Sequence, residues 1–166
     1  LHVLRAMGAD IVGENARERG GEPVADLRVR HAPLCGIEVP IEHVPDMIDE
    51  FPVLFVAAAC AEGVTVVRGA AELRVKESDR IAGMAGGLRA LGIRVDETPD
   101  GATVHGGTLR GGEVDSRGDH RVAMAFAVAA QLARGEVRID DVANVATSFP
   151  GFDALARDIG FSLRRA

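Results

Sequence analysis

The chain has 166 residues, of which 47% are hydrophobic and 27% charged, and its net charge is −6. This composition is typical of a soluble globular protein with one core or two small ones. Acids and bases are interspersed, so we expect no nucleic-acid partner, which would require a basic surface.

Membrane insertion and metal binding are not expected either. The longest apolar run, residues 53–61, has the size of a buried helix, whereas a membrane-spanning helix needs about 18 apolar residues or more. Cys35 and Cys60 form no CxxC pair and have no His at zinc spacing, so we interpret them as small hydrophobic residues of a reduced, cytoplasmic protein. The chain begins with Leu and has no signal peptide, which suggests a fragment of a longer protein.

The first predicted element is a short helix in the phrase LRAMGADIV, residues 4–12, which continues through Gly8 into a strand. Glycine after a helix is typical of the left-handed conformation that ends helices. A hairpin-like segment with period-2 character follows at residues 26–40.

The second predicted helix is apolar almost all round. Asp49 is its candidate N-cap and Pro52 lies in its first turn. The phrase VAAACAEGVTVVRG, residues 56–69, then takes the chain through Gly63 into a strand. A helix without a polar face is expected to be buried, with strands packed outside it.

The third predicted helix begins near Ser78 or Glu77, either of which could cap it. Its apolar stripe is formed by Ile81, Met84, Leu88 and Leu91. The phrase LRALGIRVD, residues 88–96, ends this helix at Gly92 and repeats the first phrase of the chain. Residues 101–115 again have a hairpin-like pattern.

The last predicted elements repeat both phrases. A helix capped by Asp119 continues into VAAQLARGEVRIDD, residues 128–141, where Gly135 precedes a strand. The phrase LARDIGFSL, residues 155–163, echoes the first phrase, with Gly160 between helix and strand. About two and a half copies of a helix–strand–helix–strand unit are therefore present. They predict an α/β fold in which sheets surround central buried helices.

Cations gather where two of these helices begin. Lys76 and Arg80 are four residues apart at one helix start, and Arg121 follows Asp119 at another. The helix dipole disfavours an exposed cation there by about 0.3–1 kcal/mol, whereas the free N–H groups and the dipole attract anions. One interpretation is an anion site; the other is that Lys76–Glu77 and Asp79–Arg80 are ordinary solvated surface pairs.

Asp49 and His120 also have two interpretations each. Asp49 is either a plain N-cap or a functional carboxylate, and His120 is either a satisfied buried histidine or a proton carrier beside Arg121. The sequence contains no GxGxxG, no GxxxxGK[ST] and no nucleophile elbow. These absences disfavour a Rossmann site, a P-loop and serine-hydrolase chemistry.

Four motifs resemble the EPSP synthase (3-phosphoshikimate 1-carboxyvinyltransferase) family, in the order of that family. They are MIDEFPVL at residues 47–54, LRVKESDRI at 73–81, GDHRVAMAF at 118–126 and ATSFPGF at 146–152. The resemblance implies the enolpyruvate transferase fold, an inverse α/β barrel with two domains of three βαβαββ units each and an active site between the domains. Residues 1–166 resemble one domain, the C-terminal one, without its first elements.

The resemblance also implies a reaction. Members of the family transfer the enolpyruvyl group of phosphoenolpyruvate to the 5-hydroxyl of shikimate 3-phosphate, in the shikimate pathway to chorismate and aromatic amino acids. It implies that Arg80 and Arg121 hold phosphoenolpyruvate and that Lys76 reaches the shikimate hydroxyl and the reacting centre. The implied partners are these two substrates and the N-terminal domain.

The catalytic roles implied by the resemblance concern three further side chains. Asp49 contacts the shikimate ring and takes the hydroxyl proton, Glu77 exchanges a proton with the methylene carbon, and His120 supports the anion site. No cofactor or metal is implied. Thr147 departs from members of the family that carry a lysine before S/T-F-P, so that contact with phosphoenolpyruvate must come from elsewhere.

Two alternatives to this function exist. One is the related transferase that acts on UDP-N-acetylglucosamine and uses a loop cysteine of the other domain; the segments around Cys35 and Cys60 do not resemble it. The other is a non-catalytic anion-binding module of the same fold. The chain retains the implied site residues of this domain, which argues against that module.

Overall fold

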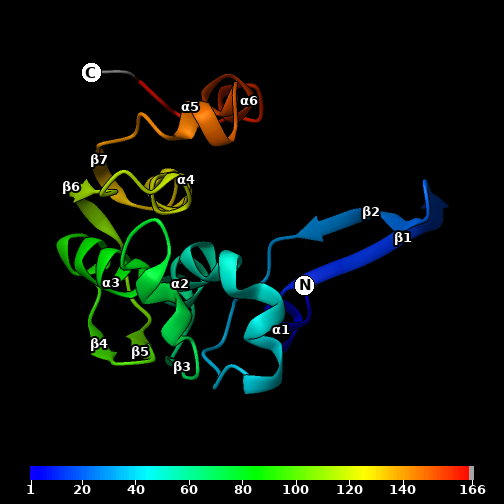
Figure 1. Ribbon diagram of the computed structural model, residues 1–166, viewed down its shortest axis with the longest axis horizontal. Coiled ribbons are helices and arrows are strands. Elements are labelled where there is room, and N and C mark those ends of the chain that lie inside the picture. The colour runs from blue at the N-terminus through cyan, green and yellow to red at the C-terminus, as the bar shows by residue number, and fades with distance from the viewer. Residues whose placement is uncertain (165–166) are drawn as a thin grey trace.

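A computed structural model describes residues 1–164 and has the α/β architecture that the sequence predicts (Figure 1). The α-helices are α1 (His2–Ala6), α2 (Phe51–Cys60), α3 (Arg80–Ala90), α4 (His120–Ala130), α5 (Val145–Ser148) and α6 (Phe152–Asp158). Short 3-10 helices are Ile41–His43, Pro45–Glu50 and Ala71–Val75. No helix among the described residues is both long and apolar enough to cross a membrane.

Within residues 1–164, seven strands form three small sheets. The strands are β1 (Asp10–Arg19), β2 (Glu22–Arg30), β3 (Val64–Val67), β4 (Val95–Thr98), β5 (Gly101–His105), β6 (Arg110–Asp115) and β7 (Arg134–Asp140). β1 and β2 form a hairpin, and β5 lies between β3 and β4 with both pairings antiparallel. β6 and β7 are parallel, which requires a crossover connection, and α4 provides it.

The predicted repeat is present in the topology. Residues 35–38 form parallel bridges with the β3 segment, Cys35 to Glu62 and Glu38 to Val66, and α2 is the crossover between them. The β6–α4–β7 segment has the same arrangement. One complete unit therefore runs from residue 35 to β5 in the order β-α-β-α-β-β.

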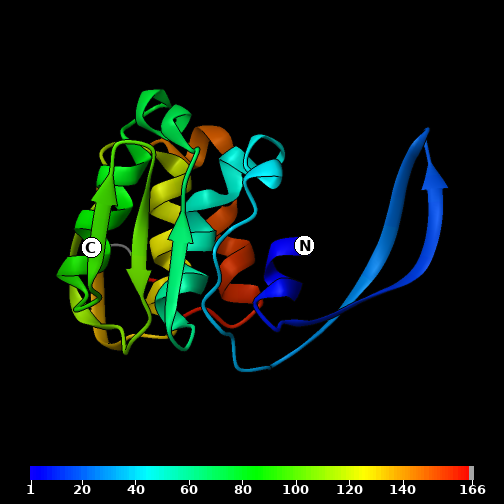
Figure 2. The ribbon, with the colours of Figure 1, turned by 90° about the horizontal axis from the view of Figure 1, so that it is seen from below.

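The core lies between the helices and the sheets, as predicted. Phe51 and Phe55 of α2 and Phe126 of α4 are fully buried. In Figure 2, β3, β5 and β4 lie on one side of α2, α3 and α4, and the β1–β2 hairpin extends away from the rest. The apolar helices are thus central and the strands external, because a helix without a polar face must be buried away from water.

The glycines that follow α1, α3 and α6 have the predicted left-handed conformation. Gly8, Gly92 and Gly160 have φ values of 100°, 86° and 102°. The strand predicted after Gly160 is not formed within the described residues, which have no regular structure from 161 to 164.

The hairpin predicted at residues 101–115 is wrong. β5 and β6 belong to different sheets. The residues between them do not form a hairpin turn, because the N–H groups of Gly106 and Gly107 donate to the carbonyls of Gly63 and Ala59. Gly106 makes this path possible, since a Cβ there would lie 1.6 Å from the Ala61 carbonyl oxygen.

The hairpin predicted at residues 26–40 is displaced. The actual hairpin joins β1 and β2, and its turn uses Gly20 and Gly21 at φ values of 62° and 84°. Only the second half of β2, residues 26–30, falls in the predicted range. The segment that follows crosses to β3 because its N–H groups, such as that of Gly36, find carbonyl partners there.

A pair of neighbouring glycines in α3 tests the packing between α3 and α4. A Cβ on buried Gly87 would lie 2.2 Å from Cζ of Phe126, so Gly87→Ala should destabilise the chain by about 1–3 kcal/mol through overpacking. Gly86 is exposed with no atom within 4 Å of such a Cβ, so Gly86→Ala should stabilise by about 0.4–1 kcal/mol. Urea unfolding of both variants checks the opposite signs; equal effects would contradict this packing.

Candidate functional site

The helix starts differ in part from the prediction. Asp119 caps α4 as predicted, since its Oδ1 accepts hydrogen bonds from the backbone N–H of Arg121 at 2.9 Å and Val122 at 3.3 Å. The cap of α3 is neither Ser78 nor Glu77 but Asp79, whose carboxylate accepts from the Ala82 N–H.

Asp49 does not cap α2. It lies in the 3-10 helix Pro45–Glu50, which runs directly into α2, so Glu50 occupies the N-cap position with helical dihedrals and no side-chain cap bond. Pro52, the second helical residue, also lacks the N–H that a cap would bond. The Asp49 carboxylate is therefore available for other contacts.

Arg80 is the centre of the site. Its side chain is 1% exposed, yet it carries a charge, which burial permits only with paired partners. Its Nε donates to Asp119 Oδ2 at 2.8 Å, Nη1 to Asp49 Oδ1 at 2.9 Å and Nη2 to Glu77 Oε2 at 2.5 Å. The predicted site residues of three different segments thus meet at one guanidinium.

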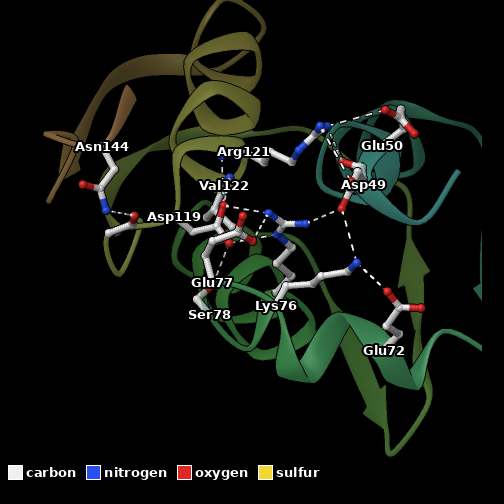
Figure 3. A network of polar contacts seen from close by, with 12 residues as sticks. Asp49, Glu50, Glu72, Lys76, Glu77, Ser78, Asp119, Arg121, Val122 and Asn144 are labelled. Atoms are coloured by element: carbon white, nitrogen blue, oxygen red, sulfur yellow. Dashed lines mark hydrogen bonds and ion pairs between the residues drawn. The ribbon is translucent and has the colours of Figure 1, made fainter. Parts of the chain in front are cut away.

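Asp49 lies among three cations, as Figure 3 shows. Besides Arg80, Lys76 Nζ is 3.7 Å from its Oδ1 and Arg121 Nη2 is 3.9 Å from its Oδ2. Partial burial raises the pKa of Asp49, but the hydrogen bond from Arg80 and the charges of Arg121, Lys76 and Arg80 outweigh it and hold the pKa below its ordinary value.

The two other cations are partly open to solvent. Lys76 is 22% exposed and pairs with Glu72, which raises the pKa of its ammonium group. Arg121 is 35% exposed and donates to the backbone carbonyl of Asp49 at 2.9 Å. Both can therefore contact a ligand directly, whereas Arg80 can do so only if a ligand replaces one of its carboxylate partners.

A shallow groove lies next to these charged side chains. Asp49 and Arg121 line it together with apolar side chains of α2, α4 and α6, among them Val53, Met124 and Phe152. Polar groups that converge at the side of an apolar hollow are typical of small-molecule sites.

The predicted residue His120 and the position that departs from the family, Thr147, stand apart from the cluster. His120 is the first residue of α4 and is half-buried, and its side chain makes no hydrogen bond or ion pair with a described residue. Thr147 is exposed in α5, and its hydroxyl donates to the Asn144 carbonyl at 2.9 Å. The structure thus brings together Asp49, Lys76, Glu77, Arg80 and Arg121, and leaves these two outside the network.

Asp119 has a second role that the sequence did not reveal. It was predicted only as a cap, but it is fully buried and also binds Arg80. Ser78 donates to the same carboxylate at 3.1 Å. The sequence holds a signal for this contact, since the capping acid of DHR and the arginine of SDR are both expected at helix starts.

The carboxylates make stability depend on pH. Burial raises the pKa of Asp119, but Arg80 and the N–H groups at the start of α4 outweigh it, so its pKa, like that of Asp49, lies below the ordinary 3.8. A group whose pKa is lowered on folding stabilises the fold above its unfolded pKa and loses this contribution as the pH falls through the folded pKa. We expect the urea midpoint to fall as the pH drops below 3.8, and Asp119→Asn to flatten that dependence.

No group of three or more His, Cys, Asp or Glu that could hold a metal ion occurs among residues 1–164. The guanidinium groups of Arg80 and Arg121 and the ammonium group of Lys76 surround carboxylates, a combination that chemically suits anion binding and proton transfer.

Comparisons with known proteins place the chain among enolpyruvyl transferases. The family model described as EPSP synthase (3-phosphoshikimate 1-carboxyvinyltransferase) matches residues 1–155. A 3-phosphoshikimate 1-carboxyvinyltransferase of Xanthomonas axonopodis pv. citri is 69% identical over the whole chain, which spans 38% of that protein.

Solved structures agree with this match. EPSP synthase from Acinetobacter baumannii has a TM-score of 0.93 and 48% identity, covering 96% of the chain and 38% of that structure. The enolpyruvyl transferase NikO from Streptomyces tendae shares the fold, with a TM-score of 0.63 and 24% identity over 95% of the chain and 33% of its own length. The predicted fold class is therefore confirmed, and the chain spans well under half the length of these relatives.

Proposed function

Because this chain belongs to the EPSP synthase family, we propose that it forms one wall of an active site that transfers the enolpyruvyl group of phosphoenolpyruvate to the 5-hydroxyl of shikimate 3-phosphate. The observation that carries the proposal is the convergence of Lys76, Arg80 and Arg121 on Asp49. The second wall would be the remaining sequence that the longer relatives possess, which corresponds to the predicted N-terminal domain.

The cations suit the substrates, which are both polyanions. Arginine binds carboxylate and phosphate groups with two parallel hydrogen bonds, so Arg80 and Arg121 are assigned to phosphoenolpyruvate. Lys76, a compact charge on a flexible stem, is assigned to the shikimate hydroxyl and the reacting carbon. The partial exposure of Arg121 and Lys76 supports this assignment.

The reaction needs two proton transfers. The hydroxyl oxygen bonds to C2 of phosphoenolpyruvate as it loses its proton, and C3 gains a proton, which gives a tetrahedral ketal phosphate. C3 then returns a proton while the C–O bond to phosphate breaks. We assign the hydroxyl proton to Asp49 and the C3 proton to Glu77, with His120 supporting the anion site. Departure of phosphate requires stabilised negative charge, which Lys76 and the arginines supply.

The alternative functions fit less well. The family match and 69% identity favour the shikimate enzyme over a UDP-N-acetylglucosamine transferase. A non-catalytic anion-binding module has no need for Asp49 and Glu77, whose carboxylates occupy the cations that an anion would use. A cytoplasmic location remains a prediction from the sequence.

The test is phosphate release by the complete enzyme, meaning this chain joined to the remaining sequence of its relatives. We expect release with phosphoenolpyruvate and shikimate 3-phosphate and none with UDP-N-acetylglucosamine as acceptor. The chain alone should show no steady turnover, because one wall cannot hold both substrates in reactive geometry with water excluded. Release with the UDP-sugar only would replace the proposed substrate, and full turnover by the chain alone would refute the two-wall assignment.

A further inference from the structure

The three carboxylates around Arg80 differ sharply in their surroundings. The Asp119 side chain is 0% exposed, whereas those of Asp49 and Glu77 are 43% and 53% exposed. Water can therefore replace Arg80 as a partner of Asp49 and Glu77, but it cannot reach Asp119.

Asp119 also has its hydrogen-bonding capacity filled. Its Oδ1 accepts from the N–H groups of Arg121 and Val122, and its Oδ2 accepts from Arg80 Nε and Ser78 Oγ. These bonds join the start of α3 to the start of α4 through one carboxylate. A carboxylate held by several donors in the interior fixes the orientation of the groups that it binds.

We propose that Asp119 is the positioning residue of the anion site: Arg80 keeps Asp119 when an anion binds and exchanges Asp49 and Glu77 for the ligand. The inference rests on the proposed function, in which Arg80 contacts phosphoenolpyruvate. The exchange frees the two exposed carboxylates at the moment when the substrate arrives, while the Nε–Asp119 bond holds the guanidinium plane in place.

The geometry supports different roles for Nε and for the two Nη groups of the Arg80 guanidinium. Nε faces Asp119 at 2.8 Å, while the closest partners of Nη1 and Nη2 are the exposed carboxylates of Asp49 and Glu77. The Nη2 contact with Asp119 is longer, at 3.5 Å. The two Nη groups are thus the part of Arg80 that is free to change partners without loss of its buried counterion.

The first test is Asp119→Asn in the complete enzyme. Asn caps a helix about as well as Asp, so α4 should keep its start. We expect kcat/KM for phosphoenolpyruvate to fall by about 30-fold or more, mainly through KM, because Arg80 loses its fixed charged partner. The KM for shikimate 3-phosphate should stay within about threefold. In an Arg80→Lys background, Asp119→Asn should lower kcat/KM only slightly further than Arg80→Lys alone.

The matched control is Asp79→Asn. Asp79 caps the neighbouring helix in the same way and pairs with Arg74 at 2.8 Å in place of Arg80. It should change kcat/KM by no more than about threefold. If Asp119→Asn and Asp79→Asn lower kcat/KM equally, Asp119 is only a cap and the inference is overturned. The same conclusion follows if the effects of Asp119→Asn and Arg80→Lys on kcat/KM are fully additive. If Asp119→Asn fails to fold, Ser78→Ala removes one bond to the same oxygen and should shift KM in the same direction.

A second test does not depend on turnover. In the chain itself, titration with phosphoenolpyruvate should leave the Arg80 Nε–H resonance protected from exchange, while the carboxylate resonances of Asp49 and Glu77 shift. Loss of Nε–H protection on binding would overturn the inference even if the enzyme is active. Absence of phosphate release by the unmodified complete enzyme would instead count against the proposed function.

Discussion

Replacement of Arg80 by alanine is expected to lower the free energy of unfolding by about 3–5 kcal/mol, the usual loss when one partner of a buried ion pair is removed. The reason is Asp119, which is fully buried and would keep its negative charge without a cation. Urea unfolding of the chain followed by circular dichroism measures the change.

The control for Arg80→Ala is Arg68→Ala. Arg68 also pairs with a carboxylate, that of Glu38, but both side chains are 63% exposed. Exposed pairs contribute about 0–1 kcal/mol, so the control should be nearly neutral. A double variant, Arg80→Met with Asp119→Asn, should recover part of the lost stability, because the unpaired buried charge is removed while asparagine keeps the cap of α4. Similar losses for Arg80→Ala and Arg68→Ala would show that burial does not govern this network.

Replacement of Asp49 by asparagine should have opposite effects on binding and on turnover. In the complete enzyme we expect kcat to fall on the order of 10²-fold or more, in line with the contribution of a general base. Binding of inorganic phosphate should strengthen, because Asp49 no longer neutralises Lys76, Arg80 and Arg121. Phosphate release and isothermal titration with phosphate measure the two quantities.

Stability should fall only slightly in Asp49→Asn, since Asp49 is not the cap of α2 and its half-exposed carboxylate contributes little as an ion-pair partner. The control is Asp46→Asn, the same substitution at an exposed position of the same 3-10 helix. It should alter neither kcat nor phosphate binding. If Asp49→Asn weakens phosphate binding along with turnover, the carboxylate organises the cations and does not compete with the anion.

The sequence predicted the parts of this protein that depend on local chemistry. The left-handed conformations of Gly8 and Gly92, the Asp119 cap and the buried apolar helices follow from propensity and hydrophobic pattern. The Asp49 cap failed because a 3-10 helix precedes α2, and no local pattern distinguishes that connection from an extended one.

Contacts between distant segments were harder to predict from the sequence. Period-2 character around residues 101–115 predicted a hairpin, but the choice between local pairing and a crossover is made by partners such as the Ala59 carbonyl, far back in the chain. Likewise, the motifs identified Arg80 and Asp119 separately. Their ion pair joins residues 39 positions apart and emerges only when α3 and α4 pack together.

The β1–β2 hairpin has a consequence for the handling of this chain. Its register places Ile11 opposite Val29 and Gly13 opposite Leu27, so one face is apolar, and Leu27 and Val29 are 50% and 64% exposed. Among the described residues both outer edges of this two-stranded sheet lack a strand partner. An open edge with an apolar face is a template for another strand, so concentrated samples should aggregate through intermolecular β-sheet. A charged substitution such as Val29→Lys should delay this aggregation and leave the anion site unchanged.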